Sequence, residues 1–137
     1  MRVAFAADDT NECVEAVLAA LHDRGEVLRP SSSDHWPDMS RAVAEAVASG
    51  NADFGVLMCC TGTGTAIAAN KVTGVRAAQA SDPWIAENAR RWNDANVLAL
   101  SLKRTAPDVA VECVHAFLDV AGPDPEEAAN IDKLAGL

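Results

Sequence analysis

Short apolar runs alternate with stretches of helical periodicity along most of this chain. The runs typical of buried strands occupy residues 2–7, 26–28, 54–59, 75–78 and 97–100. Helical patterns follow them at residues 11–24, 39–49, 65–70, 82–92 and 107–120. Strands that alternate with helices at this spacing form a parallel sheet joined by right-handed crossovers. We therefore predict a single-domain, doubly wound (Rossmann-like) α/β fold with five parallel strands and helices on both faces.

The chain has the length of one domain, with a break near its C-terminus. Its 137 residues are enough to bury a core but not to hold a separate substrate domain. Two prolines in residues 122–125 interrupt the helical pattern. We expect residues 1–121 to form the α/β domain and residues 122–137 to be an acidic C-terminal tail helix of the same domain. Residues 30–38, rich in serine and proline, are predicted to be a loop.

Charge and cysteine spacing exclude several classes of protein. Eleven basic against twenty acidic residues give a net charge of −9, which repels nucleic acids and anionic membranes. The first residues do not resemble a secretion signal, and no apolar run reaches membrane-spanning length. The four cysteines form neither a zinc-binding pattern nor a disulfide framework. We expect a cytoplasmic protein that binds a small molecule and neither nucleic acid nor membrane.

The carboxyl ends of the strands are where ligands bind in folds of this kind. That rule selects residues 7–10, 59–64 and 81–82. The second segment carries the most chemistry, because CCTGTGT runs from a strand end through two glycines into a helix N-terminus. Backbone N–H groups and the helix dipole at such a turn hold an anion or a developing oxyanion, and they favour the thiolate of a neighbouring cysteine. The turn therefore predicts an oxyanion cradle with Cys59 as base or nucleophile.

This turn matches neither common nucleotide-binding motif. The dinucleotide fingerprint requires a glycine where Ile67 stands, and the Walker loop requires Gly-Lys, whereas Lys71 follows Asn70. A purely structural interpretation also stays open, in which Gly62 and Gly64 only let the chain turn and the cysteine is buried for packing.

Other polar residues have a structural and a functional interpretation. Asp8 and Asp9 end the first strand, where they cap the next helix or bind a ligand. His35, in the loop before Trp36, is the one histidine expected near a site, because the other two fall inside predicted helices. Residues 93–96, NDAN, by themselves indicate a loop.

Taken together, these segments resemble the ribose-5-phosphate isomerase B family, which includes the galactose-6-phosphate isomerase subunits. The family's Cys-Gly-Thr-Gly-x-Gly turn, followed by Ser-Ile-Ala-Ala-Asn-Lys, is similar to residues 59–71, CCTGTGTAIAANK. Its Asn-Asp-x-Asn-Val-Leu-Ala segment matches residues 93–99, NDANVLA, and its second helix resembles residues 44–50, AEAVASG. The similarity covers residues 1–120.

The resemblance implies a homodimer, or a dimer of such dimers, with sites at the subunit interface. It implies aldose-ketose isomerisation of a sugar through an enediol, without metal or organic cofactor. In that reaction Cys59 would be the base, and Asp8 would bind the sugar and help to open its ring. Thr61 and the amides around Gly62 and Gly64 would stabilise the enediolate. The other residues expected to bind substrate are Asp9, His35, Trp36, Thr63, Trp92, Asn93 and Lys103.

The chain departs from the family at positions concerned with ring opening and phosphate binding. Asp9 and Trp92 stand where the family has histidines, and Trp36 replaces a tyrosine of the pocket. The C-terminal motif Gly-Gly-Arg-His-x-x-Arg falls on residues 125–130, which hold no cation. Lys103, which lines up with another family arginine, is the main basic candidate that remains, with Arg104 beside it.

The acidic excess is concentrated where relatives keep phosphate-binding arginines. Residues 119–133 hold five acidic side chains against Lys133, a net charge of 1 − 5 = −4. A phosphate is normally held by guanidinium groups and is repelled by carboxylates. We therefore hypothesise a substrate that is non-phosphorylated or otherwise atypical, such as a sugar carrying an amine, stacked on Trp36 and Trp92.

Two further functions stay open. One is a non-catalytic sugar-binding protein, or a partner subunit of a hetero-oligomeric isomerase, in which Trp92 has replaced the ring-opening group. The other is a cysteine-dependent hydrolase or redox protein that uses the adjacent Cys59 and Cys60, although no histidine partner or CxxC pattern accompanies them.

Overall fold

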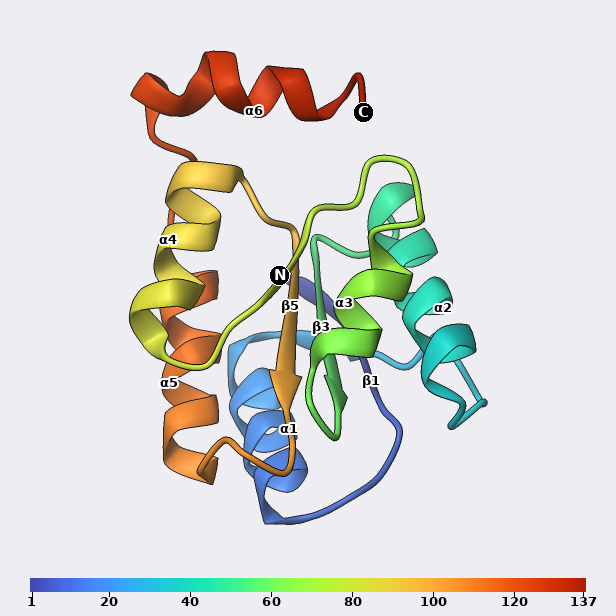
Figure 1. Ribbon diagram of the computed structural model, residues 1–137. Helices are drawn as coiled ribbons and strands as arrows, with labels where there is room; N and C mark the ends of the chain where they lie inside the picture. Colours follow the sequence, from blue (N-terminus) through green and yellow to red (C-terminus); the bar gives the residue numbers. More distant parts are fainter.

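Five parallel strands form one sheet between two layers of helices in the computed structural model, which describes all residues from 1 to 137 (Figure 1). The strands are β1 (Arg2–Ala7), β2 (Glu26–Leu28), β3 (Phe54–Cys59), β4 (Ala77–Gln79) and β5 (Val97–Ser101). The helices are α1 (Glu12–Arg24), α2 (Trp36–Ala48), α3 (Thr63–Ala69), α4 (Pro83–Asn93), α5 (Pro107–Leu118) and α6 (Ala128–Leu134), with a 3-10 turn at Pro125–Glu127. The predicted fold class is confirmed.

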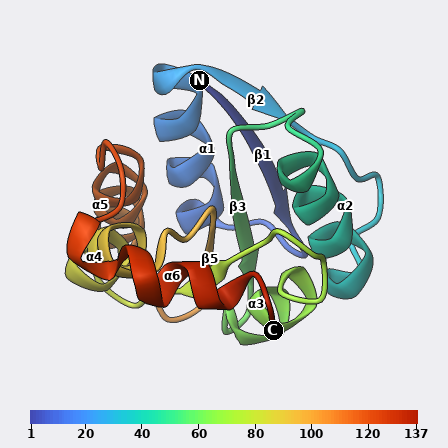
Figure 2. The same cartoon turned by 90° about the horizontal axis from the view of Figure 1, so that it is seen from above.

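The two faces of the sheet bury different side chains. Helices α1, α4 and α5 cover one face, and α2 and α3 cover the other (Figure 2). Along β1, Val3 and Phe5 point into the larger core beneath α1, α4 and α5, whereas Ala4 and Ala6 point toward α2 and α3. Because β1, β3 and β5 are buried on both faces, these three strands appear in the sequence as continuous apolar runs without polar alternation.

The strand order β2-β1-β3-β5-β4 creates the switch point that positions the site. After β1 the chain crosses to β2 on one side, and after β3 it crosses to β4 on the other. The loops that follow β1 and β3 therefore diverge, and such a divergence at the carboxyl ends of adjacent strands leaves a crevice for a ligand.

Several element boundaries differ from those expected, among them the following. Helix α2 begins at Trp36, so residues 36–38 form its first turn and not the end of a loop. Pro37 suits the first turn of α2, because N–H groups there have no partner within the helix. His35 directly precedes Trp36 and is the N-cap residue. Helix α3 begins two residues earlier than expected, and β4 covers 77–79 instead of 75–78.

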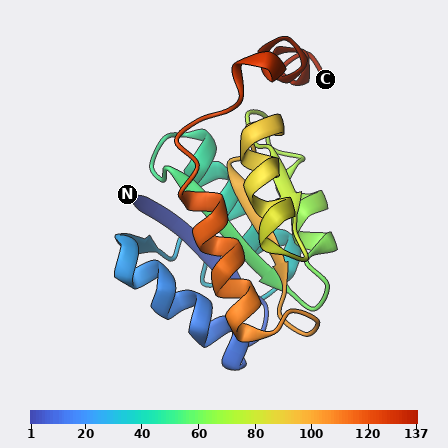
Figure 3. The ribbon, with the colours of Figure 1, turned by 90° about the vertical axis from the view of Figure 1, so that its left-hand side faces the viewer.

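The C-terminal segment extends beyond the amino-terminal end of the sheet. Helix α6 lies at the end opposite to the strand arrowheads and stands apart from the helices of the two layers (Figures 1 and 3). Its connection to α5 is held against α4, because Asp124 N–H donates to the Arg91 carbonyl at 2.7 Å and Arg90 donates to the Val120 carbonyl at 3.3 Å.

Candidate active site

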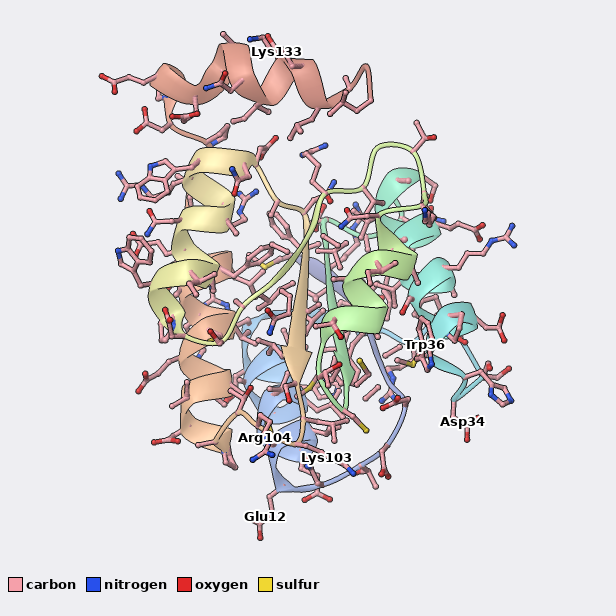
Figure 4. All side chains as sticks on the ribbon, in the orientation of Figure 1. Glu12, Asp34, Trp36, Lys103, Arg104 and Lys133 are labelled. Carbon is pink, nitrogen blue, oxygen red and sulfur yellow. The ribbon has the colours of Figure 1, made fainter.

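The carboxyl ends of β1, β3 and β5 meet at one edge of the sheet. Asp8 directly follows β1, and its N–H donates to the Met58 carbonyl of β3 at 3.2 Å, which places it beside the end of that strand. Cys59 is the last residue of β3, and Lys103 comes two residues after the end of β5. Figure 4 shows Lys103 and Arg104 at this edge, at the end where the strand arrowheads point.

The Cys59 sulfur lies inside the turn that follows β3. The side chain is 5% exposed, and the Gly62 N–H donates to its Sγ at 3.2 Å. The Thr65 hydroxyl is 3.6 Å from the same sulfur. Burial alone would raise the pKa of the Cys59 thiol, but the Thr65 hydroxyl and the backbone of the turn favour the thiolate and hold that pKa below its ordinary value. The turn therefore favours the thiolate form of Cys59.

The turn itself is braced against β5. Gly62 has φ of 77°, and a Cβ there would stand 2.9 Å from the backbone carbonyl carbon of Leu100. Ser101 in turn donates its hydroxyl to the Cys60 carbonyl at 2.6 Å. The rim of the turn is formed by Thr61 and Thr63, whose hydroxyl oxygens are 2.7 Å apart. Position 62 therefore requires glycine for both its dihedral angle and its space.

Substituting Gly62→Ala is expected to lower the free energy of unfolding by about 3 kcal/mol, because the left-handed conformation and the overlap with β5 both oppose a side chain. Gly50→Ala is the matched control, since Gly50 has φ of 81° but nothing within 4 Å of its Cβ position. The control should lose only about 1 kcal/mol. Chemical denaturation of both variants measures the difference, and equal losses would contradict a close approach to β5.

Asp8 presents an unsatisfied carboxylate to the same edge. Its Oδ1 is buried and has no hydrogen-bond partner in the protein. Burial is the main reason that the pKa of Asp8 is raised; its own backbone N–H opposes the rise, Asp9 and Asp34 add to it, and Lys103 counters them. A buried oxygen without a partner costs stability. A hydroxyl of a bound ligand that donates to this oxygen would remove that cost.

Trp36 forms a wall of the turn on the side of α2. A Cβ at Gly64 would stand 3.2 Å from Cε3 of the indole, so the glycine lets the ring lie against the turn. Trp36 is 44% exposed, and Figure 4 shows it with Asp34 on the α2 side of the strand ends. His35 is exposed and makes no side-chain bond to the N-terminus of α2.

Trp92 and Asn93 do not join these residues within one chain. They end α4 and precede β5, so they lie at the amino-terminal edge of the sheet, whereas Cys59 pairs with Ser101 at the other end of β5. Trp92 lies against Trp84 with ring centroids 5.6 Å apart. The acidic tail is also separated from Cys59 within one chain. Helix α6 lies at the amino-terminal edge, where Figure 4 shows Lys133.

A hollow of about 810 Å³ lies at that amino-terminal edge. Asn93 and Asp94 line it, together with the connection between α3 and β4 and one face of α6. The expected site residues thus divide into two groups at opposite ends of one sheet. The larger group holds Asp8, Asp9, His35, Trp36, Cys59, Thr61, Gly62, Thr63, Gly64 and Lys103.

No group of three or more His, Cys, Asp and Glu side chains is arranged to hold a metal ion. No helix combines the length and the apolar character needed to cross a membrane.

Thr65 and Asp34 are part of the site although the sequence patterns did not single them out. Thr65 is fully buried behind the turn, and Asp34 adds negative charge near Asp8. The signal for Thr65 is its position three residues after Gly62, where a hydroxyl in the first helical turn bonds back to a carbonyl, here at 3.1 Å. Asp34 lies in an irregular loop whose course no local pattern indicates.

Comparison with known proteins identifies relatives by sequence and by structure. The family described as Ribose/Galactose Isomerase matches residues 3–134. D-erythrulose-4-phosphate isomerase of Pectobacterium atrosepticum is 38% identical over 99 residues, which are 72% of this chain and 65% of that protein, just under two thirds. Ribose-5-phosphate isomerase B of Escherichia coli is 37% identical over 123 residues, covering 85% of this chain and 83% of its own length. The structure of ribose-5-phosphate isomerase B from Clostridium thermocellum superposes with a TM-score of 0.90 at 32% identity, covering 99% of this chain and 96% of the other.

Proposed function

Because this chain belongs to the ribose/galactose isomerase family, it is an aldose-ketose isomerase of the sugar-phosphate isomerase type, and we propose that Cys59 is its catalytic base. The Cys59 thiolate takes the proton from the carbon beside the carbonyl, which leaves an enediolate. The proton then returns to the adjacent carbon, and the sulfur is a thiolate again. The observation that carries this proposal is the Cys59 sulfur, held within 3.2 Å of the Gly62 N–H and with its pKa lowered.

The turn supplies the stabilisation that the reaction needs. Negative charge develops on the carbonyl oxygen as the proton leaves, and fixed donors aimed at that oxygen lower the barrier. In this proposal the Thr61 hydroxyl and the amides around Gly64 are those donors, while the Gly62 N–H donates to the Cys59 sulfur. The unsatisfied Oδ1 of Asp8 accepts a hydrogen bond from a sugar hydroxyl, and its raised pKa suits a group that also passes a proton during ring opening.

A second copy of the chain completes the site in this proposal. We place the carboxyl edge of one copy against the amino-terminal edge of the other. In a twofold dimer this contact occurs twice, so each copy contributes both of its edges. Asn93 and Trp92 then approach the Cys59 of the partner. The separation of the expected site residues into two groups within one chain supports this arrangement.

The charges around the turn favour a substrate without an ordinary phosphate. Asp8, Asp9 and Asp34 face Lys103 at this edge, so the cation is already opposed by carboxylates. The approaching edge of a second copy brings α6 and the preceding turn, with Glu126 and Glu127. A sugar that is non-phosphorylated, or that carries an amine, meets less repulsion than a pentose 5-phosphate. Trp36 offers an indole face for the apolar face of a sugar ring.

Solvent deuterium uptake beside the carbonyl reports the proton transfer whichever sugar is the substrate. We expect exchange with a free or amino sugar at a kcat/KM about tenfold above that with ribose 5-phosphate, since two close carboxylates oppose the phosphate. The panel pairs ribose, erythrulose and galactose with their phosphates and amino analogues. Asp9→Asn is the control. Removal of this negative charge should reduce the ratio of kcat/KM between the free or amino sugar and ribose 5-phosphate. A preference for any phosphorylated member would overturn the substrate proposal and leave the isomerase intact.

A partner-subunit role is the second candidate function. One relative that is 38% identical over 99 residues is a galactose-6-phosphate isomerase subunit of Clostridium acetobutylicum. Trp92, which stands at the family's ring-opening histidine, lies against Trp84 and has no acid-base group. The absence of exchange with every sugar in the wild-type protein, combined with retained sugar binding, would favour this role.

A further inference from the structure

Thr65 connects the Cys59 sulfur to the Gly62 peptide unit through a short network of hydrogen bonds. Thr65 is completely buried, and its Oγ1 lies 3.6 Å from the Cys59 sulfur and 3.1 Å from the Gly62 carbonyl oxygen. The N–H of the same glycine donates to the sulfur at 3.2 Å. Thr65 has no access to solvent, and its hydroxyl has the Cys59 sulfur and the Gly62 carbonyl as its neighbours.

The single hydroxyl proton has two alternative acceptors. In the thiol form, the Thr65 hydroxyl donates to the Gly62 carbonyl, and the S–H donates to the hydroxyl oxygen. When the thiol has lost its proton to solvent, the sulfur needs donors, and rotation of the hydroxyl turns its proton toward the sulfur. The Gly62 carbonyl keeps a partner after that rotation, since the Ala66 N–H also donates to it at 3.3 Å. The Thr65 hydroxyl, the Cys59 sulfur and the Gly62 carbonyl therefore each keep a partner in both states.

We propose that Thr65 is a positioning residue whose hydroxyl turns from the Gly62 carbonyl to the Cys59 sulfur and thereby stabilises the thiolate form of the base. The inference rests on the proposed role of Cys59 in catalysis. It adds a residue that acts only through the sulfur. The alternative is a structural role, in which the hydroxyl only closes the first turn of α3 by its bond to Gly62.

Titration of the Cys59 thiol in the absence of sugar separates these roles. The experiment uses the full chain with Cys60→Ser, so that the exposed neighbouring thiol does not react, and follows alkylation of Cys59 by iodoacetamide as a function of pH. Thr65→Val keeps the branched shape and removes the hydroxyl, and we expect alkylation about tenfold slower at neutral pH, with its midpoint about one pH unit higher. Thr65→Ser should restore both values.

Thr105→Val is the matched control, because Thr105 is also buried but makes no hydrogen bond to Cys59. Its alkylation midpoint should equal that of the parent. A Thr65→Val protein that keeps the parent midpoint overturns the proposal. If that variant does not fold, Thr65→Ala and Thr65→Ser provide the same comparison, and equal midpoints for those two overturn it as well.

The proposed role of Thr65 and the proposed role of Cys59 as base can be contradicted independently of each other. The thiol midpoint is measured without substrate, so it reports on Thr65 whether or not Cys59 is the base. In the isomerisation assay, Thr65→Val should move the acid limb of the kcat/KM profile to higher pH by the same amount, with Thr65→Ser reversing the shift. A shifted thiol midpoint with an unshifted kcat/KM profile would contradict the role of Cys59 as base and leave the effect of Thr65 on the thiol in place.

Discussion

Replacing Cys59 with alanine is expected to lower kcat for isomerisation about a thousandfold, because removal of a positioned general base usually costs 10²- to 10⁴-fold. Sugar binding should persist, since the alanine leaves the Asp8 carboxylate and the backbone donors of the turn in place. Cys60→Ala is the control, because Cys60 is the adjacent residue but its side chain is exposed and outside the turn. Steady-state kinetics and calorimetric binding of the same sugar measure the two effects.

The pH dependence gives the same prediction an independent readout. The base works as a thiolate, so kcat/KM should fall as the pH drops through the pKa of Cys59. Since Thr65 and the backbone of the turn lower that pKa, the acid limb should lie below the range of an ordinary cysteine thiol. Activity of Cys59→Ala within a few-fold of wild type, with the same acid limb, would show that another group takes the proton.

Mixing two inactive variants is expected to restore activity if the site is shared between two copies. Cys59→Ala damages the carboxyl edge, and Asn93→Ala damages the amino-terminal edge. Random exchange of subunits makes half of the dimers mixed, and each mixed dimer has one site with neither change, so about a quarter of the wild-type activity should return. The measurement is the isomerisation rate after joint refolding of equal amounts.

The matched control for this experiment mixes two changes at the same edge. Cys59→Ala with Asp8→Ala leaves every site in a mixed dimer with one defect, so no activity should return. Recovery in neither mixture would contradict the shared site, and equal recovery in both would show that the regained activity does not depend on which edge each variant damages.

The sequence predicted the sheet and the Cys59 turn well, because both depend on local patterns. Continuous apolar runs mark strands that are buried on both faces, and two glycines after β3 mark a sharp turn into a helix. The start of α2 was missed because residues 30–38 are rich in serine and proline. In the structure Trp36 already belongs to the helix, and its indole packs against the turn at Gly64.

The division of the site between the two edges also has a signal in the sequence. Asp8 directly follows one strand and Cys59 ends another, whereas Asn93 and Trp92 precede a strand. In a parallel sheet, residues that follow strands and residues that precede them lie at opposite edges. Motif similarity alone groups all four together, because a motif does not record which chain supplies each residue. The bond of Thr65 to the Gly62 carbonyl has a signal in its spacing, but its approach to the Cys59 sulfur was not predictable, because that distance is set only by the folded turn.

The bracing of Gly62 against Leu100 and Ser101 has a consequence for folding. Cys59, Gly62 and Thr65 are close neighbours in sequence, so the bonds among them can form early. The turn reaches its final shape only when β5, the last strand of the chain, has joined the sheet. Contacts between distant segments form late and slowly. A chain that is still being synthesised, or one that lacks β5, thus keeps the local bonds around the Cys59 sulfur but not the contacts with β5 that fix the shape of the turn.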